Sequence, residues 1–287
     1  LSVAAAVFAM VIGLNYSGFE TLFENKEGMA EGSEYIENTY SLAGLTDFIG
    51  EHPEWVSITS YNINDPDSGI FYQQDIPRAL GATSNLFLVI EYERQVAEGI
   101  IDPEEIVTLN DISRFALPEI SENNHEKLLE DFSGTSATID DVVTAVLQNS
   151  DLVAADYLWF ELGEQNIRTL IDSLGLPEHA LPLPFSGMYT RINPSLNDTS
   201  GLQSLEFSIF ADESISEARK LKNDMVFNES VKSQFEEDRL SLTFMQERDA
   251  LDYFPKATTK ELADLMASLV NEEIFTEGIS QQIKDKL

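Results

Sequence analysis

The chain has 287 residues, 43% of them hydrophobic, so it can bury the core of one large domain or of two intertwined subdomains. Its 51 acidic residues outnumber its 17 basic ones, and the formal net charge of -34 excludes a basic surface for nucleic acid or anionic lipid. The absence of cysteine excludes disulfides, thiolate metal sites and lipidation of an N-terminal cysteine. We interpret the acidic surface as solvated and suited to a salty habitat.

The N-terminal part differs in composition from the rest. Residues 1–14 are uncharged and almost wholly apolar, and the sequence opens on Leu1 rather than methionine. This pattern predicts an export signal or an N-terminal membrane anchor over residues 1–19. Residues 20–39 are acidic and aperiodic, as in a linker, and the folded domain is expected at residues 40–287. The expected location is therefore exported, periplasmic or extracytoplasmic.

The first predicted elements of the domain are a helix and a hairpin. Apolar residues at helical spacing predict a helix over residues 42–51. Alternating residues predict strands over 55–63 and 70–74, joined by a turn at 64–69.

A series of helices is predicted after the hairpin. Two capping-box pairs, Thr138 with Asp141 and Thr258 with Glu261, mark predicted helix starts. The predicted helices cover residues 86–99, 139–147, 151–162, 167–174, 214–237, 259–270 and 279–287, and a long ordered loop covers 177–202. The central part is therefore expected to be a helical subdomain.

Two strands, a buried helix and a helical subdomain follow one another in class A β-lactamases. Residues 81–100 resemble the family segment with the S-x-x-K motif, and residues 138–152 resemble the helix that leads to the S-D-N motif. Further similarity at 156–158, 166–176 and 257–270 extends the resemblance over about residues 42–287. The chain thus resembles the serine β-lactamase and penicillin-binding-protein superfamily. The resemblance implies an α/β (α+β) fold, with a helical subdomain beside an antiparallel sheet.

The resemblance also implies where the catalytic residues stand. In the family, a serine opens the buried helix, and a lysine one turn later helps to accept its proton. These positions hold Ala82 and Asn85 in this chain, so both catalytic groups are absent. In the second motif Ser150 and Asp151 are kept, and Leu152 stands at the asparagine position. Three changes together indicate evolutionary decay.

Two further family motifs have no counterpart in the sequence. The nearest string to E-x-x-L-N is residues 194–197, which has no glutamate three residues before Leu196. The K-T-G motif is absent, and the chain ends at Leu287 in a helix that precedes that strand in the family. The C-terminal strands are cut off or lost, and both explanations stay open. A missing strand would leave an exposed sheet edge.

Two serines are alternative nucleophiles. Ser84 lies two residues after Ala82, but Phe87 rather than a base stands three residues further on, so we expect Ser84 to be a helix N-cap. Ser150 either lines the cleft and binds a ligand, or caps the helix that begins at Asp151. Ser84 and Asp151 are also candidates for residues that line the cleft.

The histidines and the paired acids carry no catalytic or metal motif. His52, His125 and His179 lie far apart in the sequence and are expected to be ordinary surface or loop histidines. Asp140 and Asp141, like residues 236–238, are expected at exposed helix ends rather than around a metal ion. We expect no cofactor and no metal.

The sequence supports one leading hypothesis and two alternatives. The leading hypothesis is a catalytically inactive β-lactamase-like protein that binds a cell-wall peptide or a protein partner in its cleft, and no nucleic acid. The first alternative is an active hydrolase of β-lactams, esters or amides in which Ser84 or Ser150 attacks. The second alternative is a purely structural domain without a ligand.

Overall fold

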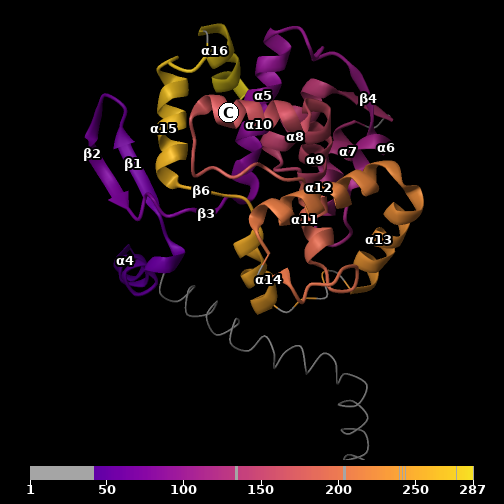
Figure 1. Ribbon diagram of the computed structural model, residues 1–287. Coiled ribbons are helices and arrows are strands. Elements are labelled where there is room, and N and C mark those ends of the chain that lie inside the picture. Colours follow the sequence, from indigo (N-terminus) through magenta and orange to yellow (C-terminus); the bar gives the residue numbers. More distant parts are fainter. Residues whose placement is uncertain are drawn as a thin grey trace, which may run out of the picture. The chain divides into compact units, whose positions relative to one another are not determined.

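A computed structural model describes residues 42–132, 135–202, 205–238, 240, 242, 244–275 and 277–286 (Figure 1). The predicted signal or anchor at 1–19 and the predicted linker at 20–39 lie outside these residues. The chain divides into two compact units, Leu1–Val56 with Leu242–Asp252, and Ser57–Ser241 with Tyr253–Leu287. Within the described ranges, no helix has the length and apolar character needed to cross a membrane.

The smaller unit contains the predicted first helix and an aromatic cluster. Its elements are α4 (Leu42–Glu51), η1 (Pro53–Trp55) and α14 (Phe244–Ala250). The ring of His52 stacks on Trp55 with centroids 4.5 Å apart, and Phe48 lies 4.7 Å from the same imidazole. Phe48 is buried, so these rings form the apolar contact that holds α4 against η1.

The larger unit begins with a hairpin of β1 (Ile58–Asn62) and β2 (Asp65–Tyr72), paired antiparallel with Ile58 opposite Tyr72. The second strand starts five residues before the prediction, so the predicted turn at 64–69 is wrong. The Asn64 N–H donates to Asn62 Oδ1 at 3.0 Å, which closes a tighter turn. Because β2 is exposed along nearly its whole length, its polar residues face water.

Two other small sheets join segments that are far apart in sequence. β3 (Arg78–Ala79) pairs with β6 (Lys256–Ala257), and β4 (Ile106–Thr108) pairs with β5 (Ser136–Thr138), both antiparallel. The described part of the chain is therefore mostly helical with small antiparallel sheets, in agreement with the expected α+β class.

The core of the larger unit surrounds α9 (Leu152–Leu162), which is apolar on nearly every face and almost wholly buried. Such a helix has to lie inside the protein. It contacts α5 (Asn85–Ala97), α7 (Glu122–Asp131), α8 (Ile139–Gln148), α10 (Glu164–Leu174) and α11 (Phe185–Ile192). The other elements of the unit are η2 (Gly81–Ser84), α6 (Leu109–Ile112), η3 (Ser113–Phe115), α12 (Phe207–Asn223), α13 (Met225–Asp238), α15 (Thr259–Val270) and α16 (Glu277–Lys286), and η5 (Leu251–Tyr253) spans the boundary between the units.

Local capping signals predicted several helix ends correctly. Both capping boxes are formed, at Thr138 for α8 and at Thr258 for α15. The helices predicted to end at residues 162 and 174 are followed directly by Gly163 and Gly175, whose positive φ values of 85° and 65° favour glycine.

Two predicted segments are wrong, each for a local reason. The expected loop at 177–202 contains α11, and the expected helix at 214–237 consists of α12 and α13. The break between α12 and α13 lies at Asp224, whose Oδ1 accepts hydrogen bonds from the N–H groups of Val226 and Phe227. This carboxylate caps the first turn of α13 and so favours a new helix start.

Candidate functional site

The start of α5 holds the positions expected for the nucleophile and its lysine. Ala82 lies in η2 and is exposed, and it presents a methyl group where the family resemblance expects a hydroxyl. Asn85 is the first residue of α5 and is only 4% exposed. Neither Nδ2 nor Oδ1 of Asn85 has a hydrogen-bond partner. The helix therefore begins with a buried, neutral amide in place of a base.

Ser84 does not have the expected capping role. Its side chain makes no cap hydrogen bond to α5, and its hydroxyl donates to the carbonyl oxygen of Gly81 at 2.8 Å. Ser84 is buried, and its hydroxyl is bonded within η2, the 3-10 helix to which Ser84 belongs. The N-cap prediction is wrong because residues 81–84 are already helical and leave no free first turn for the side chain to cap.

The S-D pair of the second motif divides into an exposed and a buried residue. Ser150 is exposed, with a positive φ of 50°. Asp151 is fully buried and is the N-cap of α9, because its Oδ1 accepts from the N–H groups of Val153 and Ala154 at 2.9 and 3.0 Å. The expectation that Ser150 caps this helix is therefore wrong. Asp151 is thus a buried carboxylate at the start of α9 rather than an exposed cleft residue.

Leu152 faces a crevice of about 10 Å³. That volume is about what a single water molecule needs. The walls are mostly apolar and come from η3, the following loop and α11; they include Phe115, Leu117, Ile120, Phe185 and Tyr189. Packing around Leu152 therefore leaves no room for a peptide-sized ligand.

The expectation of a surface or loop position is wrong for His125, which is buried in α7, whereas His179 lies in the loop after α10 as expected but is also buried. His125 is 3% exposed, with Nδ1 2.9 Å from Asp151 Oδ2 and Nε2 2.8 Å from Ser113 Oγ. His179 is 7% exposed, and its ring lies 3.9 Å from that of Phe87. Burial lowers the pKa of His179 to about 4, so it is a neutral core residue.

The paired acids at Asp140 and Asp141 serve the fold. Asp140 accepts hydrogen bonds from the Tyr92 hydroxyl and from Lys286 Nζ, and Asp141 completes the capping box of α8. Glu236 and Glu237 are exposed. Among the described residues, no group of three or more histidine, aspartate or glutamate side chains is arranged to hold a metal ion.

Comparison with known proteins identifies the family. The profile of the β-lactamase enzyme family matches residues 43–287. The chain belongs to this family. Comparison with curated proteins gives no match.

Solved structures of the family resemble the chain at low identity. The structure titled PBP-A is 12% identical, with 77% of this chain and 58% of that chain covered and a TM-score of 0.43. A mutant of the last common ancestor of Gram-negative bacterial class A β-lactamases is 16% identical, with 85% and 69% covered and a TM-score of 0.47. A further ancestral class A β-lactamase is 16% identical, with 77% and 60% covered and a TM-score of 0.43. The chain thus spans less than two thirds of two of these three relatives.

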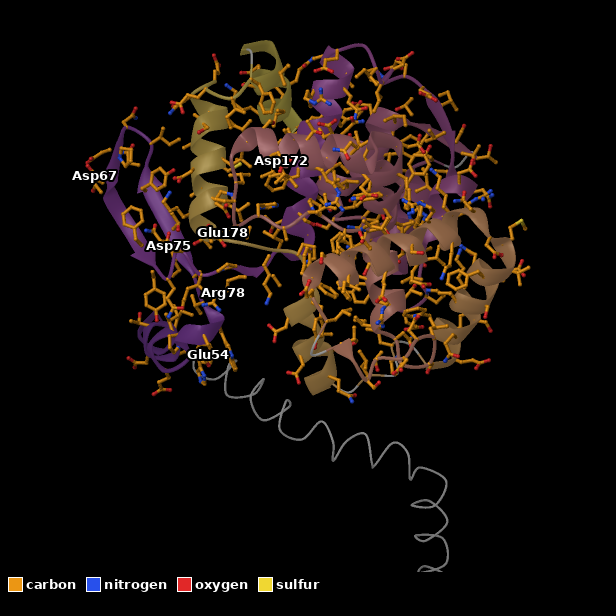
Figure 2. The ribbon with its side chains drawn as sticks, in the orientation of Figure 1. Glu54, Asp67, Asp75, Arg78, Asp172 and Glu178 are labelled. Atoms are coloured by element: carbon orange, nitrogen blue, oxygen red, sulfur yellow. The ribbon has the colours of Figure 1, made fainter. Side chains whose placement is uncertain are left out.

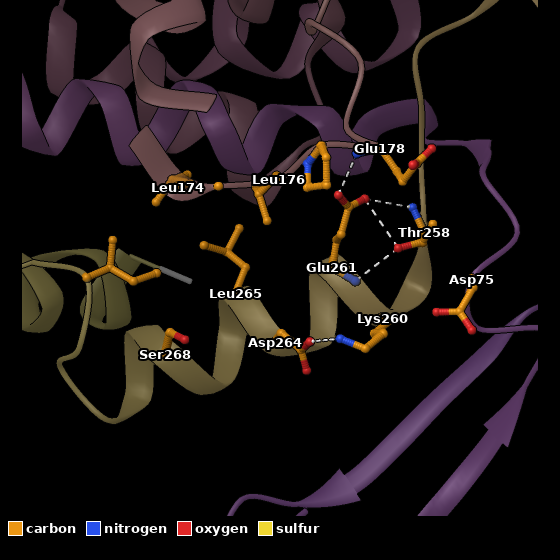
Figure 3. A pocket seen from close by; sticks show the side chains of 13 residues that line it. Asp75, Leu174, Leu176, Glu178, Thr258, Lys260, Glu261, Asp264, Leu265 and Ser268 are labelled. Atoms are coloured by element: carbon orange, nitrogen blue, oxygen red, sulfur yellow. Dashed lines mark hydrogen bonds and ion pairs between the residues drawn. The ribbon is translucent and has the colours of Figure 1, made fainter. Parts of the chain in front are cut away.

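This β-lactamase-family chain has a cavity near α15 that is larger than the crevice at Leu152. It has a volume of about 620 Å³ and lies between α15 and the segment that follows α10 (Figure 3). Asp75 and Glu178 lie on either side of the N-terminal end of α15 (Figure 2), and both line the cavity with Lys260 and Asp264. Lys260 Nζ donates to Asp264 Oδ2 at 2.6 Å, which leaves the wall with net negative charge. No sequence motif indicated this cavity.

Asp156 is a second buried acid that the sequence reasoning missed. Its oxygens accept from the N–H groups of Phe185 and Ser186 at 2.6 and 2.7 Å, so the carboxyl group caps α11. Burial raises the pKa of Asp156 to about 7, although the hydrogen bonds from Ser186 and Phe185 oppose this shift. The only signal in the sequence is an acid within a helix that has no polar face.

Proposed function

We propose that this chain is a β-lactamase-family protein that does not hydrolyse β-lactams. The observation that carries the proposal is the exposed methyl group of Ala82 at the nucleophile position. Acyl transfer requires an oxygen that attacks the carbonyl carbon, and a methyl group has none. Loss of the nucleophile lowers the turnover of a covalent hydrolase by about a million-fold.

The neighbouring positions support this proposal. An amide such as that of Asn85 cannot act as a base near neutral pH, and this one is enclosed in the protein. Leu152 brings an aliphatic side chain to the position of a polar contact. All three changes remove groups that the reaction needs.

The alternative nucleophiles lack the partners that acyl transfer requires. Nucleophilic serine needs a base within hydrogen-bond reach, but the Ser84 hydroxyl donates to a carbonyl oxygen. Ser150 stands beside Asp151, whose oxygens are engaged by two backbone N–H groups and by His125. Neither serine is therefore activated.

A fluorescent penicillin tests the proposal directly. The purified protein is incubated with the probe, and its mass is measured intact, with an active class A β-lactamase as the positive control. We expect no covalent adduct on this chain. An adduct would overturn the proposal, and its loss in Ser84→Ala or Ser150→Ala would identify the alternative nucleophile.

We further propose that the retained function is noncovalent binding, outside the cytoplasm, of a cell-wall-type peptide with a free amino group. The cavity beside α15 supports this proposal, because its volume of about 620 Å³ lies in the range of small-ligand sites. The carboxylates of Asp75 and Glu178 at its rim attract an ammonium group.

Calorimetric titration with a lysine-containing peptide tests this binding, and its N-acetylated form is the control. We expect binding that weakens on acetylation and in Glu178→Gln. Exposed Glu237 on α13 of the same unit offers a matched control, since Glu237→Gln removes one charge from a residue that does not line the cavity. Equal binding of both peptides, or none, contradicts the proposal and favours a protein partner or a structural domain.

A further inference from the structure

Three side chains from distant parts of the chain form one continuous hydrogen-bonded series. Asp151 Oδ2 lies 2.9 Å from His125 Nδ1, and His125 Nε2 lies 2.8 Å from Ser113 Oγ. The carboxylate is 0% exposed and the imidazole 3% exposed, whereas Ser113 is partly accessible. This order of atoms is that of an acid, a base and a nucleophile in serine acyl transfer.

The acid in this series is held in place by the fold. Asp151 Oδ1 accepts two N–H groups at the first turn of α9, and the 11-residue helix favours a negative charge there. An ionised carboxylate only accepts hydrogen bonds, so Nδ1 of His125 carries the proton toward it. In the neutral ring, Nε2 is then the acceptor for the hydroxyl of Ser113.

The nucleophile end of the series borders a cavity. Ser113 lines a space of about 200 Å³ with Arg114, Asn228, Glu229 and Lys232. Lys232 Nζ lies 2.9 Å from the carbonyl oxygen of Ser113, which brings a positive charge next to the serine. Arg114, Lys232 and the carboxylate of Glu229 line this wall, and Arg114 is paired with Asp111 at 3.2 Å. Lys232 is therefore the cation beside Ser113 that favours an anionic substrate, even though the whole chain is strongly acidic.

We propose that Ser113, His125 and Asp151 form a separate acyl-transfer site for small esters whose acyl group carries a carboxylate. Ser113 Oγ attacks the carbonyl carbon as its proton passes to His125 Nε2. The C–O bond to the leaving alcohol then breaks, and the alcohol takes that proton. Water, deprotonated by His125, hydrolyses the acyl-serine and returns the hydroxyl of Ser113. The developing oxyanion is stabilised by the nearby charge of Lys232.

This site does not include Ala82. An experiment can therefore refute the acyl-transfer site at Ser113 without refuting the proposed function, and the proposed function can be refuted without refuting this site. A fluorophosphonate reagent, which forms a phosphorus–oxygen bond with activated serine and releases fluoride, gives the first test. We expect a label that peptide mass spectrometry maps to Ser113. We also expect labelling to be at least about 100-fold slower in His125→Asn. Labelling that is absent from Ser113 in the folded protein, or independent of His125, overturns the proposal.

A second test remains valid if His125→Asn fails to fold. The chain has no cysteine, so Ser113→Cys introduces a single thiol whose alkylation by iodoacetamide is followed against pH. A thiol beside a histidine has a lowered pKa, so we expect a midpoint below the ordinary value of about 8.5. Ser173→Cys is the matched control, because the Ser173 hydroxyl donates only to the Leu170 carbonyl.

The pH midpoint of alkylation distinguishes an activated site at residue 113 from a hydrogen bond that serves only the fold. Burial by itself raises the pKa of a thiol, so a lowered midpoint at the less exposed Ser113→Cys reports the neighbouring imidazole and not a difference in exposure. Equal midpoints for the two variants contradict the proposal. Thermal unfolding of each variant verifies that the folded protein was measured.

Discussion

Asn85 is a buried residue whose amide is not satisfied by hydrogen bonds. It stands at the position that the family resemblance assigns to lysine, is 4% exposed, and leaves both polar atoms of its amide without partners. An enclosed amide without hydrogen bonds destabilises the folded state, because water satisfied the same atoms in the unfolded chain. The unpaired amide of Asn85 is therefore expected to lower the stability of the folded protein.

We expect Asn85→Leu to stabilise the protein by about 1–3 kcal/mol, since leucine has a similar shape and no polar atoms to satisfy. The free energy of unfolding in urea measures this change. Asn193→Leu is the matched control, because Asn193 is equally buried but accepts from the Ser195 N–H at 2.9 Å. We expect that control to destabilise. A loss of stability in Asn85→Leu would show that this amide has a role in the fold.

Asp156 links the stability of the protein to pH. Burial raises its pKa from 3.8 to about 7 in the folded protein, so the unfolded chain loses this proton first as the pH rises. Between about pH 4 and 7 the folded state binds more protons than the unfolded state, and stability falls with rising pH. Above about pH 7 both states are ionised and the loss is complete.

The variant Asp156→Asn isolates this effect, because asparagine does not titrate. We expect the stability of the wild type, relative to the variant, to fall by up to about 4 kcal/mol between about pH 4 and pH 8. Urea unfolding of both proteins across this range is the measurement. A difference that does not change with pH would mean that Asp156 has an ordinary pKa.

Among the elements, α11 shows how a tertiary contact fixes a helix. Its start is capped by Asp156, which lies 29 residues earlier in the chain. No residue next to α11 supplies a side-chain cap. The capping boxes at Thr138 and Thr258 are local and were predicted, whereas this cap depends on α9 being in place and was not.

Helix α11 also packs closely on α12 through Gly187. A Cβ atom at Gly187 would overlap the carbonyl oxygen of Ser214 and lie 3.0 Å from the Cβ of Ala218. We therefore expect Gly187→Ala to destabilise the protein by about 2 kcal/mol, because the two helices have to separate. Calorimetric melting measures the loss.

Gly278 in α16 is the control for this substitution, because a Cβ there meets nothing within 4 Å. Gly278→Ala should be neutral or stabilise by about 0.5 kcal/mol, since alanine has the higher helix propensity. If both glycine variants have the same stability, the close approach of α11 and α12 is not a determinant of the fold.

At the scale of the whole molecule, net charge dominates. With a formal charge of -34, like charges repel across the surface, and this repulsion opposes the compact state. We expect the melting temperature to rise when NaCl increases from about 0.1 M to about 1 M, because the screening length falls from about 10 Å to about 3 Å. Equal concentrations of KCl should give the same rise. A melting temperature that is unchanged or lower would contradict the interpretation of the acidic surface.

The sequence by itself determined the family, the α+β class and the helix ends with local caps or glycine stops. These features depend on residue identity or on contacts within one turn, so the linear order is enough to reveal them. The tertiary structure decided the burial of His125 and Asp151, the series that reaches Ser113, the cap that Asp156 gives to α11 and the closed crevice at Leu152. In each case the partner lies on another element, and only packing of the helices around α9 brings the two together.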